Sequence, residues 1–218
     1  MRKTFLIITF SVLQITSSSA SNCPTGDAKL KNNTPISTQC PNGFTSNAAK
    51  LGSSNIQTAM QSQSNNVQMV SAAAQNDGVP INLALAASYQ ESRFNSCAGS
   101  QTGVLGPMQL TQVTGKSLGY NRSIDQQNIK GGMAVLKQAI NACGTSNYAC
   151  LSAHYNGSNA KQQAQWANGV KNADAKLKNM NNLATLACKG STCKPSGTTP
   201  QTPTPTNNFP TSTQTILT

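Results

Sequence analysis

The middle of the 218-residue chain is predicted to fold as one all-α domain. Two observations support this prediction. Apolar residues recur every three or four positions in several windows, as on one face of a helix, and no window alternates between apolar and polar residues as a half-buried strand does. Capping and helix-breaking residues divide these windows into separate segments.

The first two helices are predicted from apolar spacing and from a break between them. One helix is expected over residues 56 to 75, although the polar stretch 61 to 66 weakens it near its middle. Residues 77 to 79 then break the chain, and Pro80 suits the first position of a new helix over residues 81 to 93. This second helix is apolar on almost every side, so we expect it to be buried.

Four further helices are expected after a loop of small residues at 96 to 106. The first of them is short, from about residue 107 to residue 114. Asp125 is predicted to cap a longer helix that runs to about residue 141. Another helix begins near Tyr148, and the last spans about residues 162 to 177.

The start of the chain resembles a secretory signal peptide. Arg2 and Lys3 precede an apolar run at residues 5 to 13, and small residues follow up to Ala20, where we expect cleavage. The run is about half of the roughly 20 residues that cross a bilayer. We therefore expect no membrane span after signal removal, and a location in the periplasm or cell envelope, or secretion.

Composition divides the chain into four segments. They are the signal peptide at 1–20, an irregular lead-in at 21–55, the helical domain at 56–187 and a Thr/Pro-rich tail at 188–218. The tail carries no charge after Lys194, and its prolines favour a disordered or extended chain.

The net charge predicts anionic partners. It is +11 for the whole chain, and removal of Arg2 and Lys3 with the signal peptide leaves +9. Because the lysines are scattered and the chain is exported, we expect no nucleic-acid binding and favour the anionic cell wall. The alternative is that the charge only keeps the protein soluble. With one histidine and no CxxC pair, we expect no metal and no cofactor.

The seven cysteines are expected to form disulfides, because all lie in the exported part. Proximity in sequence suggests three pairs and leaves Cys97 over, although spacing does not fix connectivity. A cysteine hydrolase that pairs Cys97 with His154 is the alternative. The suggested pairs are Cys23 with Cys40, Cys143 with Cys150, and Cys188 with Cys193.

Glu91 is the only glutamate in the chain, and it lies in the apolar helix. Desolvation there would raise the pKa of its carboxyl and keep it protonated near neutral pH, as a general acid requires. The alternative is a carboxylate that the helix simply exposes to water. None of the four aspartates is a natural partner for it in catalysis; they are Asp27, Asp77, Asp125 and Asp174.

Four short motifs resemble, in order and spacing, the ES, GLMQ, NI and YN signatures of the soluble lytic transglycosylase (SLT) domain. They are Glu91-Ser92-Arg93-Phe94-Asn95, residues 103–110 (GVLGPMQL), Asn128-Ile129 and Tyr155-Asn156. The resemblance implies the lysozyme-like helical fold of that family, which is related to goose-type lysozyme. Residues 155–157 and 166–170 are further similar to the VirB1-type branch, which serves type IV secretion and conjugation machines.

The resemblance implies a peptidoglycan-cleaving enzyme with Glu91 as its single acid and base. Glu91 would protonate the bond between MurNAc and GlcNAc, and the C6 hydroxyl of MurNAc would close a 1,6-anhydro ring. The residues implied to bind the glycan are Ser92, Met108, Gln109, Tyr155 and Asn156.

Other interpretations stay open for these residues and for the chain. Ser92 could instead bond to the backbone, and Met108 and Tyr155 could be core residues. Two positions depart from the family pattern, Pro107 and His154. The chain could also be a lysozyme-like hydrolase that uses water, or a wall-binding component without catalysis.

Overall fold

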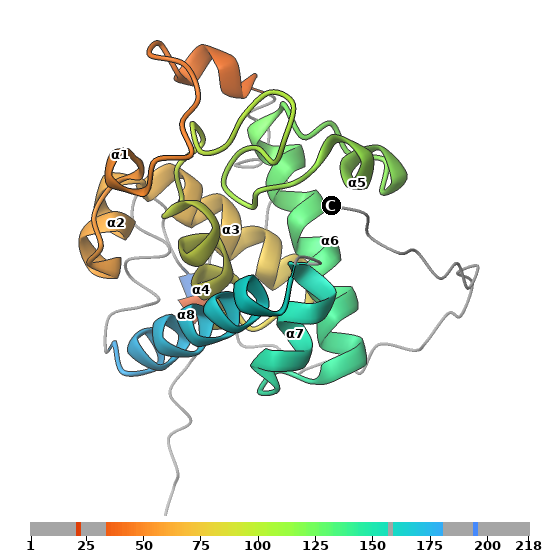
Figure 1. Ribbon diagram of the computed structural model, residues 1–218. Coiled ribbons are helices and arrows are strands. Elements are labelled where there is room, and N and C mark those ends of the chain that lie inside the picture. Colours follow the sequence, from red (N-terminus) through yellow and green to blue (C-terminus); the bar gives the residue numbers. More distant parts are fainter. Residues whose placement is uncertain (1–20, 23–33, 157–158, 181–193, 196–218) are drawn as a thin grey trace, which may run out of the picture.

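The computed structural model describes residues 21–22, 34–156, 159–180 and 194–195, and helices dominate this part of the chain (Figure 1). This confirms the all-α prediction. In chain order the helices are the 3-10 helix η1 (Ile36–Gln39), α1 (Ala48–Leu51), α2 (Ile56–Ser62), α3 (Ser64–Asp77), α4 (Ile81–Ser92), α5 (Gln112–Ser117), α6 (Asp125–Cys143), α7 (Tyr148–Tyr155) and α8 (Ala160–Lys178).

Two very short strands, which the sequence did not predict, complete the described elements. The strands β1 (Ser21–Asn22) and β2 (Lys194–Pro195) pair antiparallel, two residues each. The predicted signal peptide lies outside the described residues, as does nearly all of the Thr/Pro-rich tail. None of the described helices combines the length and the apolar character that crossing a bilayer needs.

The helix expected over residues 56 to 75 is divided in two within its polar middle. Gln63 ends α2 and precedes α3 with a non-helical backbone. The predicted break after α3 is present, because Gly78 adopts a left-handed conformation with φ +67°. Pro80 is the cap residue directly before α4, one position earlier than the first helical position predicted for it.

Two predicted helix starts are wrong. Residues 106 to 109 form a turn and Leu110 forms an isolated bridge with Leu105. The helix α5 begins only at Gln112, because Thr111 Oγ1 accepts a hydrogen bond from the Thr114 N–H at 3.0 Å and so caps the helix there. Asp125 is the first residue of α6, and Ile124 is the cap position. The Asp125 carboxylate bonds to side chains from other elements, which the sequence could not reveal.

The apolar helix α4 lies at the centre of the fold. It packs against α3 on one side and against α8 on the other, and α7 packs against both α6 and α8 (Figure 1). Leu83 and Leu85 are almost completely buried, and the residues 84 to 87 have no more than traces of exposed surface. This confirms the prediction that α4 is a buried helix. The packing of α4 against α3 and α8 also fixes the orientation of its last turn.

The lead-in residues from 34 onward pack against the segment 93–125. The Ile36 N–H donates to the Ser123 carbonyl at 2.8 Å, and its side chain is fully buried. Cys40 forms a disulfide with Cys97, with 5.5 Å between their Cα atoms. The suggested pairing of Cys40 with Cys23 is therefore wrong, because the lead-in runs beside the loop that follows α4.

The other described disulfide joins Cys143 to Cys150 and confirms that suggested pair. Because the Cys97 sulfur is bonded to Cys40, Cys97 is no free nucleophile, and the cysteine-hydrolase alternative is removed. The remaining suggested pair, Cys188 with Cys193, lies outside the described residues, as does Cys23.

Candidate active site

Glu91 lies at the end of α4, one residue before the last helical position. The chain reverses directly after it, since Arg93 and Phe94 adopt positive φ angles of 55° and 66°. The Phe94 side chain is fully buried, and its carbonyl accepts a hydrogen bond from the Asn66 amide at 2.5 Å. These contacts hold a strained turn that places Glu91 at the end of a rigid, buried helix.

The Glu91 carboxyl is held by a single described side chain. The Trp166 indole N–H, from α8, donates to Glu91 Oε1 at 2.6 Å. Desolvation by burial raises the pKa of Glu91 from its usual 4.5 to about 7, and the Trp166 hydrogen bond opposes this rise. A carboxyl with this pKa can donate a proton near neutral pH and take one back as a base.

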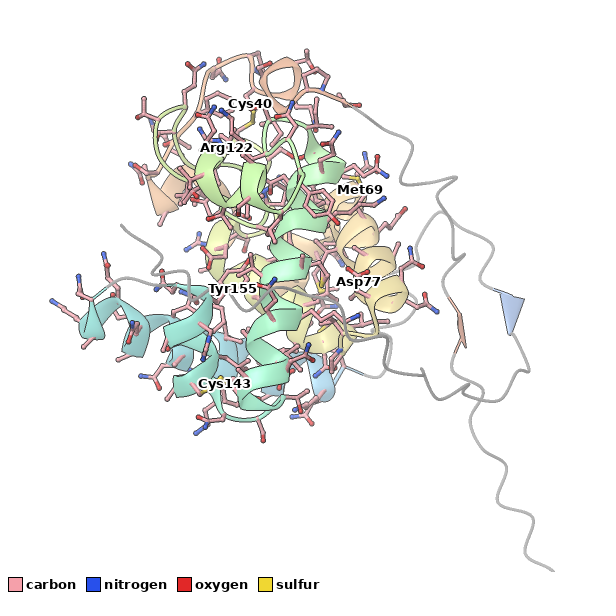
Figure 2. All side chains as sticks on the ribbon, turned by 90° about the vertical axis from the view of Figure 1, so that its right-hand side faces the viewer. Cys40, Met69, Asp77, Arg122, Cys143 and Tyr155 are labelled. Carbon is pink, nitrogen blue, oxygen red and sulfur yellow. A yellow bond between two sulfur atoms is a disulfide. The ribbon has the colours of Figure 1, made fainter. Side chains whose placement is uncertain are left out.

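Tyr155 joins this pair to the loop that follows α4. Its ring stacks on Trp166 with 5.3 Å between centroids, and its hydroxyl donates to the Met108 carbonyl at 3.1 Å. Burial, together with the negative charge of Glu91, raises the pKa of Tyr155 well above 10, so the hydroxyl stays a neutral donor. Figure 2 shows Tyr155 between the part that carries Cys40 and Arg122 and the part that carries Cys143.

Met108 and Gln109 form the inner side of this loop. Met108 is almost completely buried against α6, where a Cβ built at Gly132 would lie 2.2 Å from Met108 Cβ. Gln109 is half-buried with φ 48°, and its amide nitrogen donates to the carbonyls of Ala98 and Gly106 at 3.0 and 2.8 Å. Both side chains therefore maintain the loop, with the Met108 side chain in the core.

Ser92 is buried, and its hydroxyl lies 2.8 Å from the Pro107 carbonyl and 3.2 Å from the Ser88 carbonyl. The Ser88 hydroxyl also donates to Pro107, at 3.0 Å. This arrangement fits the interpretation in which Ser92 bonds to the backbone. It also explains why proline is tolerated at position 107, because only its carbonyl is used.

Asn156 and His154 lie near the end of α7. Asn156 is the C-terminal cap residue and is half-buried. His154 is exposed, and its ring lies within 4.8 Å of the sulfurs of Cys143 and Cys150. Because those two sulfurs are bonded to each other, they offer no thiolate to a metal ion.

No second carboxylate accompanies Glu91 among the described residues. The buried Asp125 accepts hydrogen bonds from Gln39 at 2.6 Å and Ser96 at 2.8 Å, and burial raises its pKa. The buried Asp174 accepts from Tyr148 and pairs with Lys178. Asp77 ends α3, at the opposite end of α4 from Glu91. Asp27 lies outside the described residues.

Two residues of this site were given no role from the sequence. Trp166 is the only tryptophan of the chain, and this could have marked it as a candidate. Its contact with Glu91, 75 positions earlier, could not be predicted from the sequence. Asn128 is fully buried, and its amide bonds to the Leu105 carbonyl at 2.7 Å and to the Met108 N–H at 3.1 Å. It fixes the loop 105–110 against α6.

The chain is similar to a known family and to known proteins. Residues 68–178 match the family model of the transglycosylase SLT domain. The membrane-bound lytic murein transglycosylase F of Shewanella sp. (strain ANA-3) is 49% identical over 57 residues, 26% of this chain and 12% of that relative. The transglycosylase of Enterobacteria phage PRD1 is 40% identical over 95 residues, 43% of this chain and 34% of that relative.

The helical fold, the lone carboxyl at the end of a buried helix and these matches define one class of protein. The chain belongs to the transglycosylase SLT domain family. Its match spans only about an eighth of the Shewanella relatives and about a third of the phage relative. No solved structure gives a significant match.

Proposed function

We propose that the protein is a lytic transglycosylase that cleaves the β-1,4 bond between MurNAc and GlcNAc in peptidoglycan. The observation that carries this proposal is the Glu91 carboxyl, with a pKa of about 7 and a 2.6 Å hydrogen bond from Trp166. The names of the relatives support the substrate, since the Shewanella proteins are named lytic murein transglycosylases.

The absence of a second carboxylate partner among the described residues favours an internal nucleophile. Glu91 donates its proton to the glycosidic oxygen, and the bond from that oxygen to C1 of MurNAc breaks. The C6 hydroxyl oxygen of the same sugar bonds to C1, and its proton passes to the Glu91 carboxylate. The acid is thereby restored, and the product carries a 1,6-anhydromuramoyl end.

The other candidate residues take two kinds of role in this proposal. Tyr155, whose ring stacks on Trp166, contacts the sugars together with the half-buried Gln109 and Asn156. Ser92 and Met108 act indirectly, since their bonds and packing hold the loop 107–110 in place.

The test is digestion of purified sacculi followed by mass spectrometry of the soluble products. The proposal predicts anhydro ends. Reducing ends in their place would assign the protein as a lysozyme-like hydrolase that uses water. Binding to sacculi without any soluble product would assign it as a wall-binding component.

We also propose an exported setting in which the enzyme opens the wall for a secretion or conjugation machine. The signal-like residues 1–20 support export. The similarity of residues 155–157 and 166–170 to the VirB1-type branch supports a role beside a secretion or conjugation machine. Deletion of the gene in its host should lower conjugation or secretion, and the Glu91→Gln protein should not restore it. Normal transfer in the deletion strain would contradict this setting.

A further inference from the structure

A buried carboxylate, Asp125, takes no part in the proposed chemistry. It is the first residue of α6 and is 2% exposed. Its oxygens accept hydrogen bonds from the Gln39 amide at 2.6 Å and from the Ser96 hydroxyl at 2.8 and 3.0 Å. In the described part of the chain the one ion pair belongs to Asp174, so no cation there pairs with Asp125. Because a buried carboxylate is costly unless other groups hold its charge, these two donors and the start of α6 fix it closely.

A chain of side-chain hydrogen bonds joins Asp125 to the turn that follows Glu91. Ser96 donates to Asp125 and accepts a hydrogen bond from the Asn66 amide at 2.9 Å. The same amide, which comes from α3, also donates to the Phe94 carbonyl at 2.5 Å. Asn66, Phe94 and Ser96 are all buried, so each of these bonds is stronger than it would be in water. The chain therefore connects the start of α6 to a carbonyl in the turn directly after α4.

This turn has an unfavourable backbone conformation. Arg93 and Phe94 both have positive φ angles, which residues other than glycine rarely adopt. Such a turn persists only where the surrounding contacts over-determine it. Glu91 is the last residue but one of α4, directly before the turn. A change in the turn would therefore change where the Glu91 carboxyl lies relative to Trp166.

The first turn of α6 also supports the other loop of the candidate site. Asn128 follows Asp125 by three positions, and its side chain bonds to the backbone of the loop 105–110. Residues three apart lie on the same face of a helix. One turn of α6 thus holds both the turn after Glu91 and the loop 105–110.

We propose that Asp125 is a positioning residue for Glu91. Its carboxylate holds the turn after α4 through Ser96 and Asn66, and that turn fixes the catalytic carboxyl. This inference rests on the proposed function, which gives Glu91 its catalytic role, and it adds a residue that acts without touching the substrate. Loss of the Asp125 carboxylate loosens the turn and lets water reach Glu91. Because burial is the larger cause of the raised pKa of Glu91, that pKa then falls toward 4.5.

The first experiment measures the pKa of Glu91 by NMR, independently of cleavage. Because the chain has one glutamate, mature full-length protein made with glutamate carrying carbon-13 in its carboxyl gives a single signal to titrate. Asp125→Ala should lower this pKa by about one pH unit, and Ser96→Ala should move it in the same direction. Tyr155 is the titratable side chain that interacts with Glu91, and it stays neutral in this pH range.

Asp125→Asn is the conservative variant. Its amide oxygen can still accept from Ser96, and the exposed Gln39 can turn its own oxygen toward the new amide N–H. The pKa of Glu91 should therefore stay near its wild-type value in Asp125→Asn.

Asp174→Ala is the matched control. Asp174 is 1% exposed and, like Asp125, accepts hydrogen bonds from side chains of two other elements, here Asn82 and Tyr148. Asn82 lies at the start of α4, at the opposite end from Glu91. Asp174→Ala should therefore lose stability as Asp125→Ala does, yet leave the pKa of Glu91 unchanged.

The second experiment measures cleavage of peptidoglycan at a temperature at which the variants are folded. Asp125→Ala should lower kcat about tenfold to a hundredfold with KM little changed, because a misplaced acid slows the chemical step. Asp125→Asn should recover most of this loss. An unchanged kcat in Asp125→Ala would overturn the positioning role.

The NMR titration can also overturn the proposal by itself. An unchanged pKa of Glu91 in Asp125→Ala, or an equal fall of that pKa in Asp174→Ala, would show that Asp125 does not position the acid. If Asp125→Ala does not fold, Ser96→Ala decides, and an unchanged pKa there would overturn the proposal. Failure of the wild type to cut peptidoglycan would instead overturn the proposed function.

Discussion

The carboxyl of Glu91 is subject to two opposing influences. Burial favours its protonated form, whereas the indole N–H of Trp166 stabilises the carboxylate. Because burial is the larger cause, the pKa rises to about 7. In the proposed mechanism the free enzyme must hold the proton, so cleavage should fall as the pH rises through about 7.

Replacement of Trp166 by phenylalanine tests this balance. The variant Trp166→Phe keeps an aromatic ring against Tyr155 but removes the donor to Glu91, so the pKa of Glu91 should rise further. We expect the alkaline limb of the pH profile of kcat/KM to move up by about one pH unit. Tyr155→Phe is the control, since its hydroxyl bonds to Met108 and not to Glu91, and its limb should stay near that of the wild type.

If the alkaline limb of the pH profile of Trp166→Phe stays at the wild-type pH, the indole does not lower the pKa of Glu91. A purely structural role for Trp166 would lower activity equally at every pH. The shift of the limb therefore distinguishes positioning from packing.

The loop that carries Met108 packs against α6, and this packing positions the candidate glycan-binding residues. Gly132 in α6 lets Met108 approach so closely that Gly132→Ala would bring two Cβ atoms to 2.2 Å. The gain of about 1 kcal/mol in helix propensity should be outweighed by overpacking that typically costs 1–3 kcal/mol. We expect lower thermal stability and, because the loop must shift, cleavage reduced roughly tenfold to a hundredfold.

Gly169→Ala in α8 is the matched control for this prediction. Its new Cβ would meet only the end of the Gln90 side chain, which can rotate away. This variant should keep the stability of the wild type or exceed it slightly. If Gly132→Ala proves as stable and as active as Gly169→Ala, the close approach of the loop to α6 is not required.

The two described disulfides should differ in their contribution to stability. Cys40 and Cys97 are 57 residues apart in sequence, whereas Cys143 and Cys150 are seven apart. Loop-closure entropy predicts about 4 kcal/mol for the first and about 2 kcal/mol for the second. Paired alanine variants, compared by chemical denaturation, should show the larger loss for the first pair. The reverse order would mean that the lead-in is not held by its disulfide.

For the whole molecule, we predict that the residues after about 194, which make up most of the Thr/Pro-rich tail, are dispensable for glycan cleavage. Its residues lack the apolar content to join a core, and five prolines between positions 195 and 210 disfavour regular helix. A chain that ends at Ser196 keeps the strand β2 and all seven cysteines. It should cut peptidoglycan at the rate of the full chain. A truncated chain that folds but does not cut would place the tail in the active domain.

Much of the fold was predictable because local signals agreed with it. Apolar spacing located the buried helix α4, and the break at Gly78 together with Pro80 located its start. The errors arose where tertiary contacts decide. Asp125 bonds to Gln39, 86 residues away, in place of capping its own helix, and Cys40 meets Cys97 because the lead-in folds back along the loop after α4.

The candidate site was predictable only in part, for the same reason. Glu91 was recognisable as the one glutamate in an apolar helix, and the structure gives it the raised pKa that such a setting implies. The partners of Glu91 come from α7 and α8, far along the chain. Periodicity assigns such residues to a helix but does not say which residue they face.

The central claim is that Glu91 is the single acid and base of a glycan-cleaving enzyme. The most direct test is the release of soluble products from purified sacculi by the wild type and by Glu91→Gln. Burial raises the pKa of Glu91 in the fold, so stability linked to this group is lost as pH rises from about 4.5 through about 7. The glutamine variant should therefore fold normally. Relative to the wild type, its melting temperature should be higher at pH 8 than at low pH. We predict that it releases products about 10²- to 10⁴-fold more slowly. A folded Glu91→Gln protein that cuts sacculi at the wild-type rate would contradict the claim.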